Sequence, residues 1–175
     1  MISEENLEKI KSCVHKPLNW EDYTSTDVVQ KTNSLSHAIG STIALDKQNY
    51  RLGAISGKKE INVGYNSEDE VKKLFLSDTS QLGLEVEQIS VGYYIPSFLK
   101  NIEEDTFASN EYVVLLFIEV YANGKIGDFH FLRYDVEKGW SEKRRGYPVA
   151  ILDDIVKEWP LRQRYELVGA FKMRR

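Results

Sequence analysis

The stretch from residue 111 to residue 143, EYVVLLFIEVYANGKIGDFHFLRYDVEKGWSEK, decides the fold. It contains runs of β-branched and aromatic residues at 111–121, 126–134 and 140–143, separated by polar segments. Asn123-Gly124 is a strong signal for a tight hairpin turn, and the segment from Asp135 to Gly139 reverses the chain again. The pattern therefore predicts consecutive antiparallel strands with 126–134 in the middle.

Helical patterns come before this stretch. Residues 3–14 carry an apolar stripe that Pro17 closes, and residues 32–40 combine capping residues with an apolar face. The segment Ser67-Glu68-Asp69-Glu70 is a capping box that opens a helix running to about Leu82 and stopping at Gly83. Helices at the N-terminus are therefore expected before the strands begin.

The remaining segments are assigned from composition. Residues 49–56 and 60–65 are expected to be short strands or loop, and 84–94 one or two strands. The polar and acidic segment 100–110 is predicted to be a mobile loop, and 165–173 the final strand. Helices first and an antiparallel sheet afterwards predict an α+β fold in one domain, residues 1–175, with 1–30 as an N-terminal helical extension.

Composition excludes several classes of protein. The net charge of -4 and the pI near 5.5 give no electrostatic case for a nucleic acid or an anionic membrane as partner. No secretory signal is visible and no run approaches the ~20 apolar residues of a membrane span, so a cytoplasmic location is expected, with delivery into another cell left open. One cysteine and three histidines argue against a zinc site, and no metal or organic cofactor is expected.

His130 is the first candidate for chemistry. On a strand it shares one face with Asp128, Leu132 and Tyr134. Glu142 lies on the strand that follows, where its carboxylate can accept a hydrogen bond from one imidazole nitrogen and leave the other as a base. The alternatives are a core histidine with satisfied hydrogen bonds and an exposed carboxylate beside Lys143.

Ser34 is the candidate nucleophile. It lies in TNSLSHAIG, residues 32–40, at the predicted start of a helix, where unpaired N–H groups stabilise an anion and lower the pKa of a cysteine thiol. Serine is also common at such positions simply as a capping or first-turn residue. Cys13 is interpreted as an ordinary packing or surface cysteine and His37 as a packing or rim residue.

Taken together, the motifs resemble the papain-like cysteine hydrolases, and in spacing the branch that contains the NlpC-type amidases. More narrowly, residues 31–173 resemble bacterial and phage proteins with the pattern Asn-Cys-x-x-x-Ala-Leu, then Tyr-His-Phe-Tyr-Arg, then Trp-Ser-His-Lys. His130 falls on the histidine of that pattern, and Trp140, Ser141 and Lys143 fall on its last motif. The resemblance implies a papain-like core over 31–173.

Two positions depart from that pattern. Ser34 stands where the pattern has its cysteine, as expected either in a deliberately inactivated chain or in a natural pseudoenzyme. Glu142 stands where the pattern has a histidine, and it can still orient an imidazole. Both alternatives for Ser34 remain open at this point.

The resemblance implies acyl transfer at an amide, isopeptide or thioester bond. Ser34 would mark the nucleophile, His130 the base and Glu142 the orienting residue, with a protein or peptide as substrate and an oxyanion hole that includes the Ser34 backbone N–H. The neighbouring residues expected to contact the substrate or oxyanion are Gln30, Asn33 and Trp140. The alternative is a non-catalytic binding or inhibitor protein that uses the aromatic residues of VGYYIPSF, 91–98, and the basic segment 143–145.

Overall fold

The computed structural model describes residues 2–45, 50–58, 67–158 and 165–175. It has an α+β architecture in which N-terminal helices precede an antiparallel sheet. The helical part comprises α1 (Glu4–Val14), a 3-10 helix (Trp20–Tyr23), α2 (Thr26–Lys31), α3 (Ser34–Ile39) and α4 (Glu68–Gln81). The helices predicted at 3–14, 32–40 and from Ser67 to Leu82 are therefore confirmed.

Within the described residues the sheet has six strands in the order β1-β6-β2-β3-β4-β5, and every neighbouring pair is antiparallel. The three strands predicted from the opening stretch are confirmed, and so is the final strand. β5 was not predicted. The strands are β1 (Glu85–Ile89), β2 (Glu111–Val120), β3 (Ile126–Asp135), β4 (Gly139–Lys143), β5 (Val149–Ile151) and β6 (Tyr165–Arg174).

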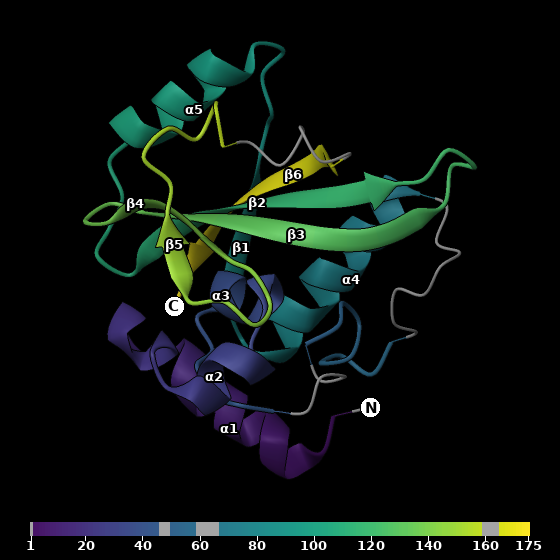
Figure 1. Cartoon of the computed structure of the whole chain (residues 1–175), viewed down its shortest axis with the longest axis vertical. Coiled ribbons are helices and arrows are strands. Elements are labelled where there is room, and N and C mark those ends of the chain that lie inside the picture. Colours follow the sequence, from purple (N-terminus) through teal and green to yellow (C-terminus); the bar gives the residue numbers. More distant parts are fainter. Residues whose placement is uncertain (1, 46–49, 59–66, 159–164) are drawn as a thin grey trace.

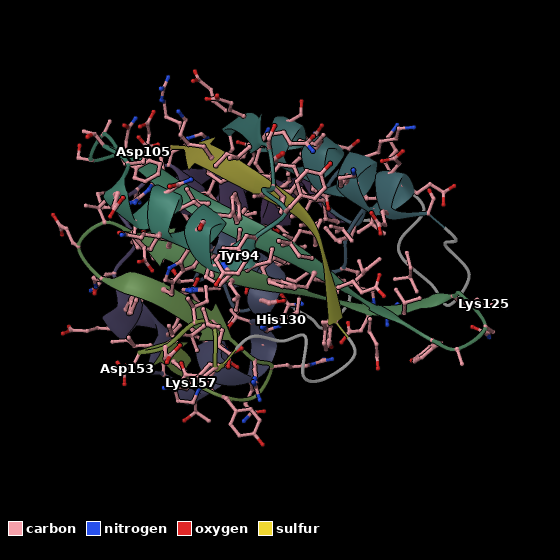
Figure 2. The ribbon with its side chains drawn as sticks, turned by 90° about the horizontal axis from the view of Figure 1, so that it is seen from above. Tyr94, Asp105, Lys125, His130, Asp153 and Lys157 are labelled. Carbon is pink, nitrogen blue, oxygen red and sulfur yellow. The ribbon has the colours of Figure 1, made fainter. Side chains whose placement is uncertain are left out.

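Helices cover both faces of this sheet (Figure 1). The helix α5 (Ile95–Glu104) lies on one face, while α1, α2, α3 and α4 lie on the other. The hairpin between β2 and β3 extends to one side, and its tip is marked by Lys125 in Figure 2. The layers therefore run helix, sheet, helices.

The two layers correspond to two buried apolar clusters, which we call the N-terminal core and the α5 core. The N-terminal core combines residues of α1, α3 and α4 with one face of the sheet, and it includes Ile10, Leu35, Phe75, Leu116 and Phe171. The α5 core packs the apolar stripe of α5 on the other face. Its members include Phe98, Leu99, Ile102, Leu115, Phe117, Leu132, Trp140 and Ala170.

Side-chain hydrogen bonds cap the N-termini of α3 and α4. Ser67 accepts a hydrogen bond from the backbone N–H of Glu70, which fixes the start of α4. At α3, Asn33 accepts from the N–H of Ser36 while the Ser36 hydroxyl accepts from the N–H of Asn33, so both ends of a capping box are made. Gly40 ends α3 with a φ of 77°, a conformation that glycine adopts without steric cost.

The prediction for 84–110 was wrong in part. Only Glu85–Ile89 forms a strand, and the predicted mobile loop at 100–110 begins with the second half of α5. Pro96 suits the first turn of this helix, and Ile95, Phe98, Leu99 and Ile102 recur at helical spacing. Residues 51–57 form turns, whereas the prediction for 60–65 lies outside the described residues. Among the described helices, none has the length and apolar character needed to cross a membrane.

We expect Phe75→Ala to lower the free energy of unfolding by about 3–5 kcal/mol, because it empties a fully buried site. The Phe75 ring lies 4.9 Å from that of Phe131 and 5.0 Å from that of Phe171, so its loss leaves a cavity where α4 meets the sheet. Urea unfolding followed by circular dichroism measures the change. Leu76→Ala, at the neighbouring exposed position, should cost no more than about 0.5 kcal/mol, and equal costs would contradict this packing.

Candidate functional site

The structure brings His130 and Glu142 together. Leu132 pairs with Glu142 across β3 and β4, and His130 lies two residues before Leu132, so both side chains project from the same face. His130 Nε2 and Glu142 Oε2 are 2.9 Å apart, with side-chain exposures of 13% and 9%. Because Nε2 is held by the carboxylate, Nδ1 is the ring nitrogen left for another partner.

Arg144 completes this group. Its Nε lies 2.9 Å from Glu142 Oε1, so the two carboxylate oxygens of Glu142 face different cations or donors. Burial acts to raise the pKa of the Glu142 carboxyl, but the hydrogen bond and charge of His130 and the charge of Arg144 outweigh it, so this pKa is lowered. Glu142 is therefore ionised at neutral pH and holds the imidazole in a fixed orientation.

The surroundings of His130 belong to the α5 side of the sheet. Phe117, a member of the α5 core, pairs with His130 across β2 and β3. The Tyr165 ring lies 6.0 Å from the imidazole, and its hydroxyl donates to Asp128 Oδ2 at 3.1 Å. Figure 2 looks onto this side of the molecule and shows His130 together with Tyr94, the residue before α5.

Ser34 is the first residue of α3 and is almost fully buried, with 5% exposure. The cap of α3 is made by Asn33 and Ser36, and within the described part of the chain the Ser34 hydroxyl forms no hydrogen bond. The Asn33 amide is already used in both directions, because Oδ1 accepts from Ser36 N–H and Nδ2 donates to the Tyr50 carbonyl at 2.8 Å. Asn33 therefore holds a helix start rather than offering a free donor.

The structure does not bring Ser34 into hydrogen-bonding contact with His130. Helix α3 packs in the N-terminal core, where its His37 contacts Ser141 and Arg133. By strand alternation, Arg133 and Ser141 project from the face opposite to His130 and Glu142. The side chains of His130 and Glu142 thus project from one face of the sheet, and α3 packs on the other.

Gln30 and Trp140, the other residues predicted to contact a substrate, lie on different elements, α2 and β4. Gln30 is exposed on α2, and its Oε1 approaches Gly146. Trp140 is buried in the α5 core, where its Nε1 donates to Glu103 Oε1 at 2.8 Å and its ring packs 5.1 Å from Tyr134. Trp140 therefore fixes α5 to the sheet.

A buried polar network that the sequence prediction missed lies beneath α3. Arg133 is fully buried; its Nε and Nη2 donate to the two carboxylate oxygens of Asp135 at 2.7 and 2.8 Å, and its Nη1 donates to the His37 carbonyl. His37 Nε2 lies 2.9 Å from the Ser141 hydroxyl. Burial, and then the charges of Arg133 and Lys143, hold the pKa of His37 well below its ordinary value, so the ring is neutral. The sequence signal for this network was a charged residue, Arg133, on the strand face that also carries Phe129 and Phe131.

Lys143 differs from the surface cation expected from sequence. It is fully buried, and its ammonium donates to the carbonyls of Val29, Thr32 and Arg144 at 3.0, 3.3 and 3.0 Å. Burial lowers its pKa to about 8. Lys143 therefore ties β4 to the end of α2 and takes no part in a basic surface.

The remaining candidates have structural partners. Cys13 Sγ lies 3.3 Å from the Thr42 hydroxyl, and His15 Nε2 lies 2.8 Å from the Leu82 carbonyl. Across the described ranges, no group of three or more His, Cys, Asp or Glu side chains is arranged to hold a metal ion. Comparison of the chain with protein-family models, with curated proteins and with solved structures gives no match.

We expect Glu142→Gln to lower the free energy of unfolding at pH 7 by about 1–2 kcal/mol, because it removes a charged acceptor of His130 and Arg144. The carboxyl pKa is lower in the folded state, so this stabilisation is present above pH 4.5 and is lost as the pH falls through the folded-state value. Urea unfolding of both proteins from pH 7 down to pH 3 measures the effect. The two stabilities should converge in acid.

Glu137→Gln serves as the control, since Glu137 is exposed on the β3–β4 turn. It should leave stability within about 0.5 kcal/mol of the unmodified chain at both ends of the pH range. A difference between Glu142→Gln and the unmodified chain that stays constant with pH would show that the carboxylate charge is unimportant.

Proposed function

We propose that this chain is a non-catalytic binding protein for a peptide or protein segment, built on a papain-like architecture whose nucleophile position carries serine. The observation that carries the proposal is that, within the described residues, no hydrogen bond joins Ser34 to the His130–Glu142 pair. Acyl transfer requires the base within hydrogen-bond reach of the nucleophile. Ser34 instead lies on α3 in the N-terminal core, and its hydroxyl makes no hydrogen bond within the described residues.

An exposed aromatic segment supports binding. Tyr93 and Tyr94 are 112% and 68% exposed, and Val91 beside them is 41% exposed, immediately before α5. Large apolar side chains in such a run are unusual on a free surface, and tyrosine is enriched at protein interfaces. Arg145 adds an exposed cation, whereas Lys143 is buried and does not contribute. The segment 91–94 is therefore the surface assigned to the partner.

A thiol hydrolase is the second candidate, and one observation favours it. His130 is oriented by an ionised carboxylate, and position 34 opens a helix whose cap is complete. A cysteine at position 34 would restore the pattern of the family that the sequence resembles. The two candidates differ in whether the base acts on position 34.

The Ser34→Cys variant separates the two candidates. We expect iodoacetamide to alkylate this cysteine near pH 7 no faster than an ordinary thiol of pKa about 8.5, because no base contacts it. Peptide mapping by mass spectrometry distinguishes position 34 from Cys13. The ordinary thiol is measured on the unfolded variant, so burial at position 34 can only slow the reaction further.

The same measurement on Ser34→Cys with His130→Ala is the control. Equal rates in the two variants agree with a binding protein. Labelling of position 34 that is at least about tenfold faster than the unfolded reference, and that slows when His130 is removed, would overturn the proposal and establish the hydrolase.

The binding surface is tested with short peptides selected by phage display on the immobilised chain. We expect the double variant Tyr93→Ser and Tyr94→Ser to weaken binding of the selected peptides at least about tenfold, because two exposed aromatic anchors are lost. The matched control is Tyr147→Ser, since Tyr147 is 67% exposed outside this segment. Peptides that bind both variants equally well would exclude the segment 91–94.

A further inference from the structure

A pocket of about 630 Å³ lies where four parts of the chain meet. It is formed by the segment after α1, the segment before β2, the β3–β4 turn and the end of β6. Its walls combine apolar side chains with cations, and they include Leu18, Trp20, Phe107, Lys138 and Arg175. The volume is in the usual range for sites that take a small molecule.

Unpaired polar atoms gather beneath this pocket. In the described part of the chain, the buried side-chain atoms without a hydrogen-bond partner are Trp20 Nε1, His37 Nδ1, Tyr112 Oη and Arg175 Nε. They form two pairs, because the Trp20 ring lies 6.2 Å from that of His37 and the Arg175 guanidinium lies 5.4 Å from the Tyr112 ring, and one member of each pair, Trp20 and Arg175, lines the pocket. Buried polar groups are normally paired, so such a concentration indicates a missing partner.

The missing partner is an acceptor. Trp20 Nε1 and Arg175 Nε can only donate hydrogen bonds. Two of the carboxylates that line the pocket are already engaged, since Asp135 accepts from Arg133 and Glu111 pairs with Arg174, whereas the third, Glu137, is exposed on the β3–β4 turn. An uncompensated donor in a low-dielectric site favours an anion over a neutral or cationic ligand.

Arg175 is the side chain best placed to receive that anion. Its Nη1 donates to the Lys16 carbonyl at 3.4 Å, and its Nη2 lies 3.8 Å from Asp135 Oδ1, both at the long end of their range. Burial, and then the charge of Arg133, lower the pKa of Arg175, and the charge of Asp135 only partly offsets them. The Lys138 ammonium, 4.8 Å over the Trp20 ring, adds a second cation on an exposed turn.

We propose that this pocket binds a small monoanionic carboxylate with an apolar body. The carboxylate would pair with Arg175 and with Trp20 Nε1, and the apolar body would contact Phe107 and Leu18. A dianion such as phosphate fits less well, because Glu137 lines the same pocket together with Glu111 and Asp135 and would repel the second charge. The Trp20 and Arg175 nitrogens are shielded from solvent, so binding requires a local rearrangement of the side chains that line the pocket. This site is independent of the function proposed for segment 91–94.

The test is a titration of the ¹⁵N-labelled protein with sodium phenylacetate, followed by the indole N–H cross-peaks. We expect the Trp20 signal to move downfield and to saturate with a Kd of about 1 mM or tighter, as its unpaired N–H gains an acceptor. The Trp140 signal is the internal control, because its N–H already donates to Glu103. Trp20→Phe and Trp140→Phe spectra assign the two peaks.

Two further comparisons make the result specific. Phenylacetamide, the neutral isostere, should bind at least about tenfold more weakly, and Arg175→Gln and Lys138→Ala should each weaken phenylacetate binding. Arg145→Gln, an exposed cation away from the pocket lining, should have no effect. Three results would overturn the proposal: a Trp20 signal that does not move, equal binding of the acid and the amide, or binding unchanged by substitution of either Arg175 or Lys138. The buried donors would then be assigned to hydrogen bonds with water.

Discussion

The burial of β2 on both of its faces is the constraint on which the rest of the structure depends. Tyr112, Val114 and Leu116 face the N-terminal core, and the residues between them face the α5 core, each with at most 1% of its surface exposed. A strand of this kind is stable only when both faces of its sheet are covered. The N-terminal helices cover one face, so the chain must return with α5 to cover the other.

The same alternation decides which side chains can act together. The spacing of 126–143 predicted the hairpin, and from it the neighbouring positions of His130 and Glu142, because both are properties of local sequence. The relation of Ser34 to His130 depends on which face α3 covers. That choice is made by Leu35, Ala38 and Ile39 packing against distant parts of the chain, and no local spacing records it.

The features that sequence reasoning missed have physical reasons of the same kind. The apolar stripe of α5 was present in 95–102, but the polar residues that follow it made the segment look like a loop. Arg133 stands among aromatic residues of a strand, and its burial is tolerated because Asp135, two residues on and on the same face, accepts from Nε and Nη2 while the His37 carbonyl accepts from Nη1. The sequence predicts that Lys143 belongs to a charged surface segment, whereas its buried ammonium donates hydrogen bonds to three backbone carbonyls.

The capping box of α3 has an evolutionary consequence. Asn33 and Ser36 hold the helix start without help from the hydroxyl at position 34, so serine and cysteine, which are similar in size, satisfy the fold equally well there. Exchange of serine and cysteine at position 34 then changes the free energy of unfolding very little. Selection acts on this exchange only through the reactivity of the side chain. A lineage could lose a nucleophile at this position and keep the whole architecture, so catalytic and non-catalytic descendants would stay one codon change apart.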